Sequence, residues 1–259
     1  PGRARQSVAG TATRGEARQG RARLGDAGSD RLGLARQGLA RQGFAGRAPV
    51  SGQDYLFVST ADIDICVAAG MNCFRLVFSH EAMISNAAYQ MTLYSRVAYM
   101  RGKGCTVVLD IHPGDAALAP SVNGTTILPG NSAEASLVLL WKSLATTYKA
   151  DQGVHFGIMN EPNAGFPPRA TVTPSQWFQT AQKVLSAIRS TGATNQVWMP
   201  GAGWSGAGNW ASVNGPFWNL VDTVPGKLGI QVHMYFDANS GGGDSTIWNQ
   251  DVGVERLKN

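Results

Sequence analysis

From Tyr55 onward, short runs of apolar residues alternate with longer segments in which apolar and polar positions recur at helical spacing. Five runs predict buried strands, at residues 71–78, 105–111, 154–159, 196–200 and 228–234. Helical patterns fill the intervals at residues 59–70, 87–101, 133–148 and 173–190, with a shorter one at 218–224 and another beginning at 248–257. Buried strands that alternate with helices are typical of parallel βαβ units. The pattern therefore predicts an α/β protein.

Polar residues with catalytic chemistry lie at the carboxyl ends of these predicted strands. They are Arg75 in the first, His112 after the second, Asn160 and Glu161 after the third, and His233 and Tyr235 at the fifth. The carboxyl ends of barrel strands form the face on which (β/α)8 enzymes build their active sites. A doubly wound sheet is the alternative architecture, but no glycine-rich phosphate-binding fingerprint follows any of the strands.

The third strand ends in a carboxylic acid. Residues 154–158 are mostly apolar, and Asn160, Glu161 and Pro162 follow them. A carboxyl group at the mouth of an apolar strand is partly desolvated, which favours its neutral form and raises its pKa. A general acid that works near neutral pH needs such a carboxyl. Taken alone, the same residues also fit a turn with a solvated Glu161. The choice between a general acid and a turn residue therefore depends on the rest of the sequence.

Residues 1–48 have a different composition from the rest of the chain. Ala-Arg-Gln-Gly recurs at 17–20 and 35–38, and residues 1–50 hold ten Arg and three acids, a net charge of +7. Because the whole chain carries +5, the remainder sums to −2. A stretch so poor in large apolar residues cannot offset its ordering entropy. We interpret 1–48 as a disordered or non-native leader and 49–259 as a partial α/β barrel. Nucleic-acid binding is the alternative for the leader, which has no Trp or Tyr to stack on bases.

Other features exclude several classes of protein. No run of about 18 apolar residues occurs, so no transmembrane helix is expected. The Arg-rich start of the chain lacks the apolar segment of a secretory signal. We expect no metal and no cofactor, because ligand spacing is missing from the four histidines, His80, His112, His155 and His233. Buried free thiols are expected for the three cysteines, Cys66, Cys73 and Cys105.

Five motifs in this order carry a resemblance to a known family. They are MNCFRLVF, VVLDIH, FGIMNEP, GAGW and VHMYFD, within residues 55–259. Together they resemble glycoside hydrolase family 5, specifically its fungal- and bacterial-type endo-β-1,4-glucanases. The resemblance implies a (β/α)8 TIM barrel that cleaves β-1,4-glucan with retention of configuration. It also implies a secreted, monomeric enzyme with a polysaccharide substrate, no membrane partner and no nucleic-acid partner.

The resemblance assigns roles to individual residues. Glu161 matches the acid/base residue, Asn160 the neighbour that holds a sugar 2-hydroxyl, and Arg75 the arginine that orients the nucleophile and keeps it ionised. The polar ring around the cleavage subsite is matched by His112, His233 and Tyr235, and a sugar-binding loop tryptophan by Trp204. A buried arginine beside a carboxylate stabilises its charged form, which supports the role of Arg75. Core positions are predicted for Trp141, Trp177 and Trp198.

The chain departs from the family pattern at both ends. Segments of the sequence correspond to strands two to six of the barrel, whereas strands one, seven and eight are missing. Retention needs a second carboxylate about 5–5.5 Å from the acid, yet none of Asp237, Asp244 and Glu255 ends an apolar strand. We therefore expect a chain that lacks the nucleophile Glu and has little or no hydrolase activity. A β-mannanase, another barrel glycosidase and a catalytically inactive glucan-binding protein remain alternatives.

Overall fold

The computed structural model describes residues 57–112, 120–122, 124–163 and 172–236. Its elements are α4 (Thr60–Ala68), β1 (Cys73–Phe78), α5 (His80–Ser85), α6 (Ala87–Gly102), β2 (Thr106–Ile111), β3 (Ser121–Val122), β4 (Thr125–Thr126), α7 (Ser132–Tyr148), β5 (Val154–Gly157), α8 (Pro174–Arg189), β6 (Val197–Pro200), η2 (Gly203–Ser205), η3 (Ala207–Asn209), α9 (Trp210–Asn214), η4 (Gly215–Phe217) and β7 (Leu228–Gln231).

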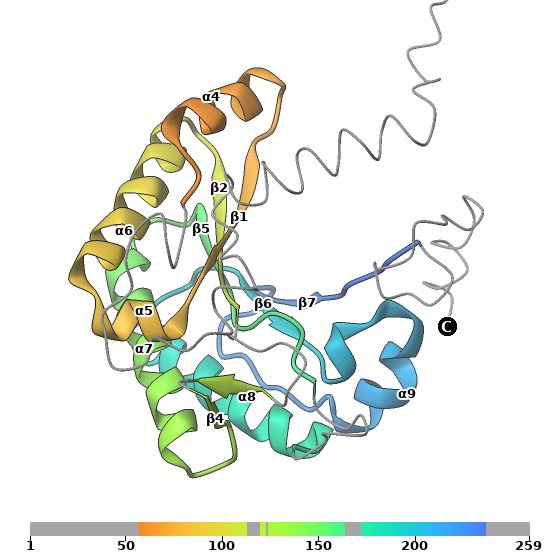
Figure 1. Cartoon of the computed structure of the whole chain (residues 1–259). Helices are drawn as coiled ribbons and strands as arrows, with labels where there is room; N and C mark the ends of the chain where they lie inside the picture. The colour runs from red at the N-terminus through yellow and green to blue at the C-terminus, as the bar shows by residue number, and fades with distance from the viewer. Residues whose placement is uncertain (1–56, 113–119, 123, 164–171, 237–259) are drawn as a thin grey trace, which may run out of the picture.

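Five of the strands form one parallel sheet in the order β1-β2-β5-β6-β7. Each strand of this sheet therefore lies beside the one that precedes it in the chain. Helices α4, α6 and α7 lie on the outer side of β1, β2 and β5 (Figure 1). Sequential parallel strands with helices on one side are the arrangement of a (β/α)8 barrel. The described residues supply a five-stranded part of such a barrel.

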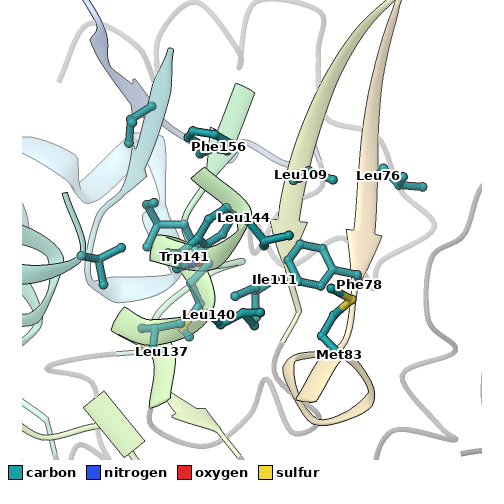
Figure 2. Packing of buried hydrophobic residues seen from close by; sticks show 14 of the residues in the cluster. Leu76, Phe78, Met83, Leu109, Ile111, Leu137, Leu140, Trp141, Leu144 and Phe156 are labelled. Atoms are coloured by element: carbon teal, nitrogen blue, oxygen red, sulfur yellow. The ribbon is translucent and has the colours of Figure 1, made fainter. Parts of the chain in front are cut away.

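The core lies between the outer face of the sheet and the helices. Leu76, Leu109 and Phe156 are paired across β1, β2 and β5 and are fully buried. Trp141 of α7 is also fully buried, and its ring centroid lies 5.8 Å from that of Phe156. Figure 2 shows Trp141 between strand residues of this layer. Its indole N–H donates to the Ile158 carbonyl at 3.0 Å, so the packing residue also fixes the end of β5.

The inner face of the sheet carries a different set of side chains. Asp110, Gly157, Trp198 and Gly229 lie in one register row across β2, β5, β6 and β7. A Cβ atom at Gly157 would lie 2.9 Å from Asp110 Oδ1, and one at Gly229 would lie 2.4 Å from the Trp198 ring. The two glycines therefore make room for a buried carboxylate and a large aromatic side chain in the same row.

Most of the predicted elements are confirmed. The five strands and the helices α4, α6, α7 and α8 occur within a few residues of the predicted bounds. The short helix α5 and the β3–β4 hairpin were not predicted. The predicted helix at 218–224 is wrong, because the side-chain amide of Gln182 pairs with both the N–H and the carbonyl of Val221. The predictions for 1–48 and 248–257 lie outside the described residues.

The three cysteines are free thiols, as expected, but they are not all buried. Cys66 and Cys105 are buried, whereas Cys73 is exposed at the start of β1, which lies at the edge of the sheet. Within the described part of the chain, no helix has the length and apolar character needed to cross a membrane.

Candidate active site

The sequence-predicted residues form two groups of side chains at the carboxyl end of the sheet. In the first group, Arg75 and His112 both contact Asp110, and Arg75 also contacts Asn160. The second has His233 and Tyr235 around Glu161. The adjacent residues Asn160 and Glu161 join the two groups, so the structure brings six of the seven predicted residues into one connected site.

Asp110 lies at the centre of the first group and is fully buried. Arg75 Nη2 and His112 Nε2 each lie 2.8 Å from Asp110 Oδ2. The same Arg75 nitrogen donates to Asn160 Oδ1 at 2.8 Å. A buried carboxylate is costly unless it is paired with a cation or with hydrogen-bond donors. Asp110 therefore holds Arg75 and His112 together, and Arg75 connects them through Asn160 to the segment that carries Glu161.

Two expectations about Arg75 change. Its side chain is 38% exposed, where a buried arginine was expected, because β1 lies at the edge of the described sheet. Among the described residues, the carboxylate that it contacts is Asp110. The sequence analysis did not assign a role to Asp110. The available signal was an acid in the otherwise apolar VVLDIH segment, two residues before His112 and thus on the same face of an extended strand.

Glu161 has two hydrogen-bond partners on a single oxygen. His233 Nδ1 lies 2.6 Å from Glu161 Oε1, and the Tyr235 hydroxyl donates to the same atom at 2.9 Å. On its other side, His233 Nε2 lies 3.0 Å from the side-chain amide nitrogen of Gln231. Nδ1 donates to the Glu161 oxygen, because an ionised carboxylate only accepts. Gln231, which the sequence analysis did not identify, contacts the His233 ring on the side away from Glu161.

The backbone at Glu161 is in the left-handed region, with φ of 43°. Such a conformation is uncommon for a residue other than glycine and persists only where the surroundings hold it. The N–H of Asn160 donates to the Ile111 carbonyl at 2.7 Å, which ties this turn to the end of β2. Successive side chains of a regular strand point to opposite faces. The turn breaks that alternation, and the side chains of both Asn160 and Glu161 reach partners in the site.

The expectation of a raised pKa for Glu161 is wrong. Burial of the carboxyl is the largest single influence and raises its pKa. The hydrogen bond from His233, the electrostatic attraction of that ring, the Tyr235 hydrogen bond and the attraction of His112 together outweigh burial. The pKa of Glu161 is consequently held below the ordinary glutamate value, and the carboxyl is ionised at neutral pH.

The backbone of Trp204 is hydrogen-bonded to the residue that follows Glu161. Its N–H donates to the carbonyl of Pro162, the residue after Glu161, at 3.1 Å, and 36% of the residue is exposed. Trp210, in contrast, packs against Trp218 with ring centroids 6.0 Å apart. The predicted core positions of Trp141 and Trp177 are confirmed, since both are buried. Trp198 is only partly buried and lies on the inner face of the sheet.

A metal site in the described part of the chain would need several His, Cys, Asp or Glu side chains around one point. In this part of the chain, no group of three or more His, Cys, Asp or Glu side chains is arranged to hold a metal ion. In the contacts described above, one oxygen of each carboxylate instead has two nitrogen or hydroxyl partners.

Comparison with known proteins identifies the family. Residues 37–259 match the family described as Cellulase (glycosyl hydrolase family 5). The chain belongs to glycoside hydrolase family 5. Among curated proteins, this family 5 chain is 31% identical over 186 residues to the manganese dependent endoglucanase Eg5A of Phanerodontia chrysosporium, covering 67% of this chain and 45% of the relative. It is 26% identical over 215 residues to endo-beta-1,4-glucanase B of Aspergillus niger, covering 80% of this chain and 60% of the relative.

A solved structure of a family 5 enzyme confirms the fold. The structure of XacCel5A in complex with cellopentaose matches with a TM-score of 0.71 and 27% sequence identity, covering 81% of this chain and 67% of the other. The family 5 chain therefore has the (β/α)8 architecture over the part that is described. It spans about half the length of the curated relatives it matches, 45% in one case and 60% in another.

Proposed function

We propose that the site belongs to an endo-acting retaining hydrolase of β-1,4-glucan, with Glu161 as its acid/base residue. The observation that carries the proposal is the pairing of one Glu161 oxygen with His233 and Tyr235 at the carboxyl end of the sheet. The two curated relatives are named as an endoglucanase and an endo-β-1,4-glucanase, and the solved relative binds cellopentaose. These names favour glucan over mannan as the substrate.

The neighbouring residues suit the binding of a sugar beside the acid. Asn160 accepts a hydrogen bond from Arg75 through Oδ1, so its amide nitrogen is the atom left to donate to a sugar hydroxyl. Trp204 is partly exposed next to Pro162, where its ring can stack on the apolar face of a pyranose. In this proposal His112 acts through Asp110, because it contacts the same carboxylate oxygen as Arg75 and so helps to hold that carboxylate in place.

The lowered pKa of Glu161 bears on its catalytic role. A proton donor must hold a proton at the working pH, and a second carboxylate nearby raises the pKa of the first by charge repulsion. In a retaining enzyme that second carboxylate is also the nucleophile, about 5–5.5 Å away. Asp110 is occupied by Arg75 and His112. We therefore propose that no carboxylate among the described residues serves as the nucleophile, and that this chain binds glucan and hydrolyses it little or not at all.

Binding and hydrolysis can be measured separately on the 259-residue chain. We expect cellopentaose to bind in calorimetric titration, with mannopentaose binding more weakly. Trp204→Ala should reduce the affinity about 10-fold or more, since stacking of a ring on an aromatic side chain is worth roughly 1–3 kcal/mol by analogy with bases. Glu81→Gln, a substitution in the first turn of α5, is the matched control for Glu161→Gln.

The outcomes discriminate between the alternatives. Failure of cellopentaose to bind would remove the glucan-binding proposal, and tighter binding of mannopentaose would replace glucan with mannan. Release of reducing ends from a soluble cellulose derivative, present in the Glu81→Gln control and absent in Glu161→Gln, would show that the chain does contain its nucleophile.

We also propose that the protein is monomeric and extracellular, where cellulose is found. Size-exclusion chromatography with light scattering tests the oligomeric state, and fractionation of the source culture tests the location.

A further inference from the structure

The 201–206 loop, with sequence GAGWSG, follows β6 and contains the most unusual backbone of the site. Gly203, Trp204 and Ser205 are consecutive left-handed residues, with φ of 63°, 56° and 58°. Two of the three are not glycine, and residues with a Cβ atom adopt this conformation at an energetic cost. Strain of this kind persists where surrounding contacts over-determine it, so the contacts of the loop identify what it holds in place.

Ser205 makes the contacts that hold this loop to the end of β7. The residue is fully buried. Its hydroxyl accepts a hydrogen bond from the N–H of Gly201 at 3.0 Å and donates to the carbonyl of Gln231. Its own carbonyl accepts from the N–H of His233 at 2.8 Å. One side chain and one peptide group thus fix the backbone at two positions of the strand end, two residues apart.

Of the two residues that Ser205 fixes, His233 contacts Glu161 and Gln231 contacts His233. The loop also holds the backbone beside Glu161. The N–H of Trp204 donates to the carbonyl of Pro162, the next residue, at 3.1 Å. Adjacent residues of one loop therefore hold the backbone next to Glu161 and the backbone of His233.

We propose that Ser205 is a positioning residue, whose hydroxyl and carbonyl hold Gln231 and His233 so that the His233 imidazole meets Glu161. The importance of this for glycoside hydrolysis rests on the proposed function, whereas the positioning itself is a property of the fold. A serine that only stabilised the loop would affect unfolding and leave the carboxyl of Glu161 unchanged. Ser205 is expected to affect both.

Carbon-13 labelling of glutamate carboxyl groups provides a direct measurement. The chain has five glutamates, Glu16, Glu81, Glu134, Glu161 and Glu255, so their resonances can be assigned by single substitutions to Gln. In the wild type the pKa of Glu161 lies below the ordinary range because of its His233 and Tyr235 contacts, against the opposing effect of burial. Ser205→Ala removes the hydroxyl, loosens His233 and should move the titration midpoint of Glu161 upward. Ser205→Gly removes the same hydroxyl while relieving the left-handed strain and should give the same shift.

Thr180→Val is the matched control. Thr180 is buried and its hydroxyl donates to Glu134 at 2.7 Å, between helices α7 and α8. The pKa of Glu134 is lowered by its contacts with Lys183, Gly130 and Thr180, which together outweigh the larger single effect of burial. This control should therefore move the midpoint of Glu134 upward and leave that of Glu161 in place. The Ser205 variants should show the opposite selectivity.

Each outcome of the experiment decides the proposal. An upward shift of Glu161 alone in Ser205→Ala and Ser205→Gly supports positioning. An unchanged Glu161 midpoint in a folded Ser205 variant overturns it, as does an equal shift in Thr180→Val. If neither Ser205 variant folds, Ser205 has a stabilising role alone and the proposal is also overturned. The carbon-13 titration contains no substrate. Failure of cellopentaose to bind would therefore refute the proposed function without affecting the interpretation of the titration.

Discussion

Gly157→Ala tests whether the inner face of the sheet depends on the space beside Asp110. The added Cβ would lie 2.9 Å from Asp110 Oδ1 and 3.1 Å from the Leu109 carbonyl oxygen. The first distance is shorter than real Cβ contacts, and the second involves strand backbone that cannot move alone. Asp110 is fully buried, and its other oxygen contacts Arg75 and His112. The carboxylate therefore cannot turn away without breaking those contacts.

The size of the effect follows from two opposing contributions. Forcing an extra methyl group into a packed interior typically costs about 1–3 kcal/mol. Replacing glycine with alanine lowers the entropy of the unfolded chain, which stabilises the fold by about 0.4–1 kcal/mol where the backbone conformation is compatible. For Gly157→Ala we expect a net loss of roughly 1.3 kcal/mol in the free energy of unfolding, the difference between the midpoints of those ranges. Cellopentaose affinity should fall as well, because Asp110 positions Arg75.

Urea denaturation followed by tryptophan fluorescence measures the stability change. A lower midpoint with an unchanged slope would report lost stability of the native state. Gly102→Ala is the matched control, because nothing lies within 4 Å of a Cβ at this helical glycine. The control should gain about 0.5–1 kcal/mol, the usual difference between glycine and alanine in a helix. If Gly157→Ala were as stable as wild type while Gly102→Ala showed its gain, the crowding argument would be refuted.

Two further predictions concern ion pairs and the acid itself. Asp222→Asn breaks a buried pair in which Arg189 Nε lies 2.7 Å from Asp222 Oδ1, and should cost about 3 kcal/mol at neutral pH in the same urea assay. Burial raises the pKa of Asp222, but its contacts with Arg189 and nearby backbone N–H groups outweigh burial. The pKa of Asp222 is therefore below the ordinary aspartate value. This stabilisation is complete above the ordinary aspartate pKa and is lost as the pH falls through the folded-state value, so the difference from wild type should shrink in acid; a pH-independent difference would contradict the assignment. Tyr235→Phe removes one hydrogen bond to Glu161 and should raise the pKa of Glu161 in the carbon-13 titration, whereas an unchanged or lower midpoint would show that the hydroxyl does not stabilise the carboxylate.

The sequence predicted the features that depend on local pattern. Continuous apolar runs identified the strands of the sheet, because a strand covered on both faces needs few polar positions. The placement of His112 and Glu161 after their strands identified the carboxyl-terminal edge of the sheet, since parallel strands carry their carboxyl ends to the same edge. Arg75 lies earlier, at the third of the six residues of β1. These deductions required only the order of residues along the chain.

The features that failed depend on partners far away in sequence. The pKa of Glu161 is lowered by His233, 72 residues later in the chain. A strand-end carboxyl considered alone offers only desolvation, which acts in the opposite direction. The helix expected at 218–224 was lost in the same way, because Gln182 supplies the backbone of Val221 with hydrogen bonds from 39 residues away. Local pattern contains no information about such contacts.

The strand order of the sheet has a consequence for biosynthesis. Each strand of the five-stranded sheet pairs with the strand made just before it, so a segment leaving the ribosome finds its partner already in place. The newest strand then presents an unpaired edge until its successor arrives, and unpaired edges invite association with another chain. In β7 and the residue after it, Ile230 is 45% exposed and Val232 43% exposed. A nascent chain halted with this segment outside the ribosome would present that apolar edge to other chains.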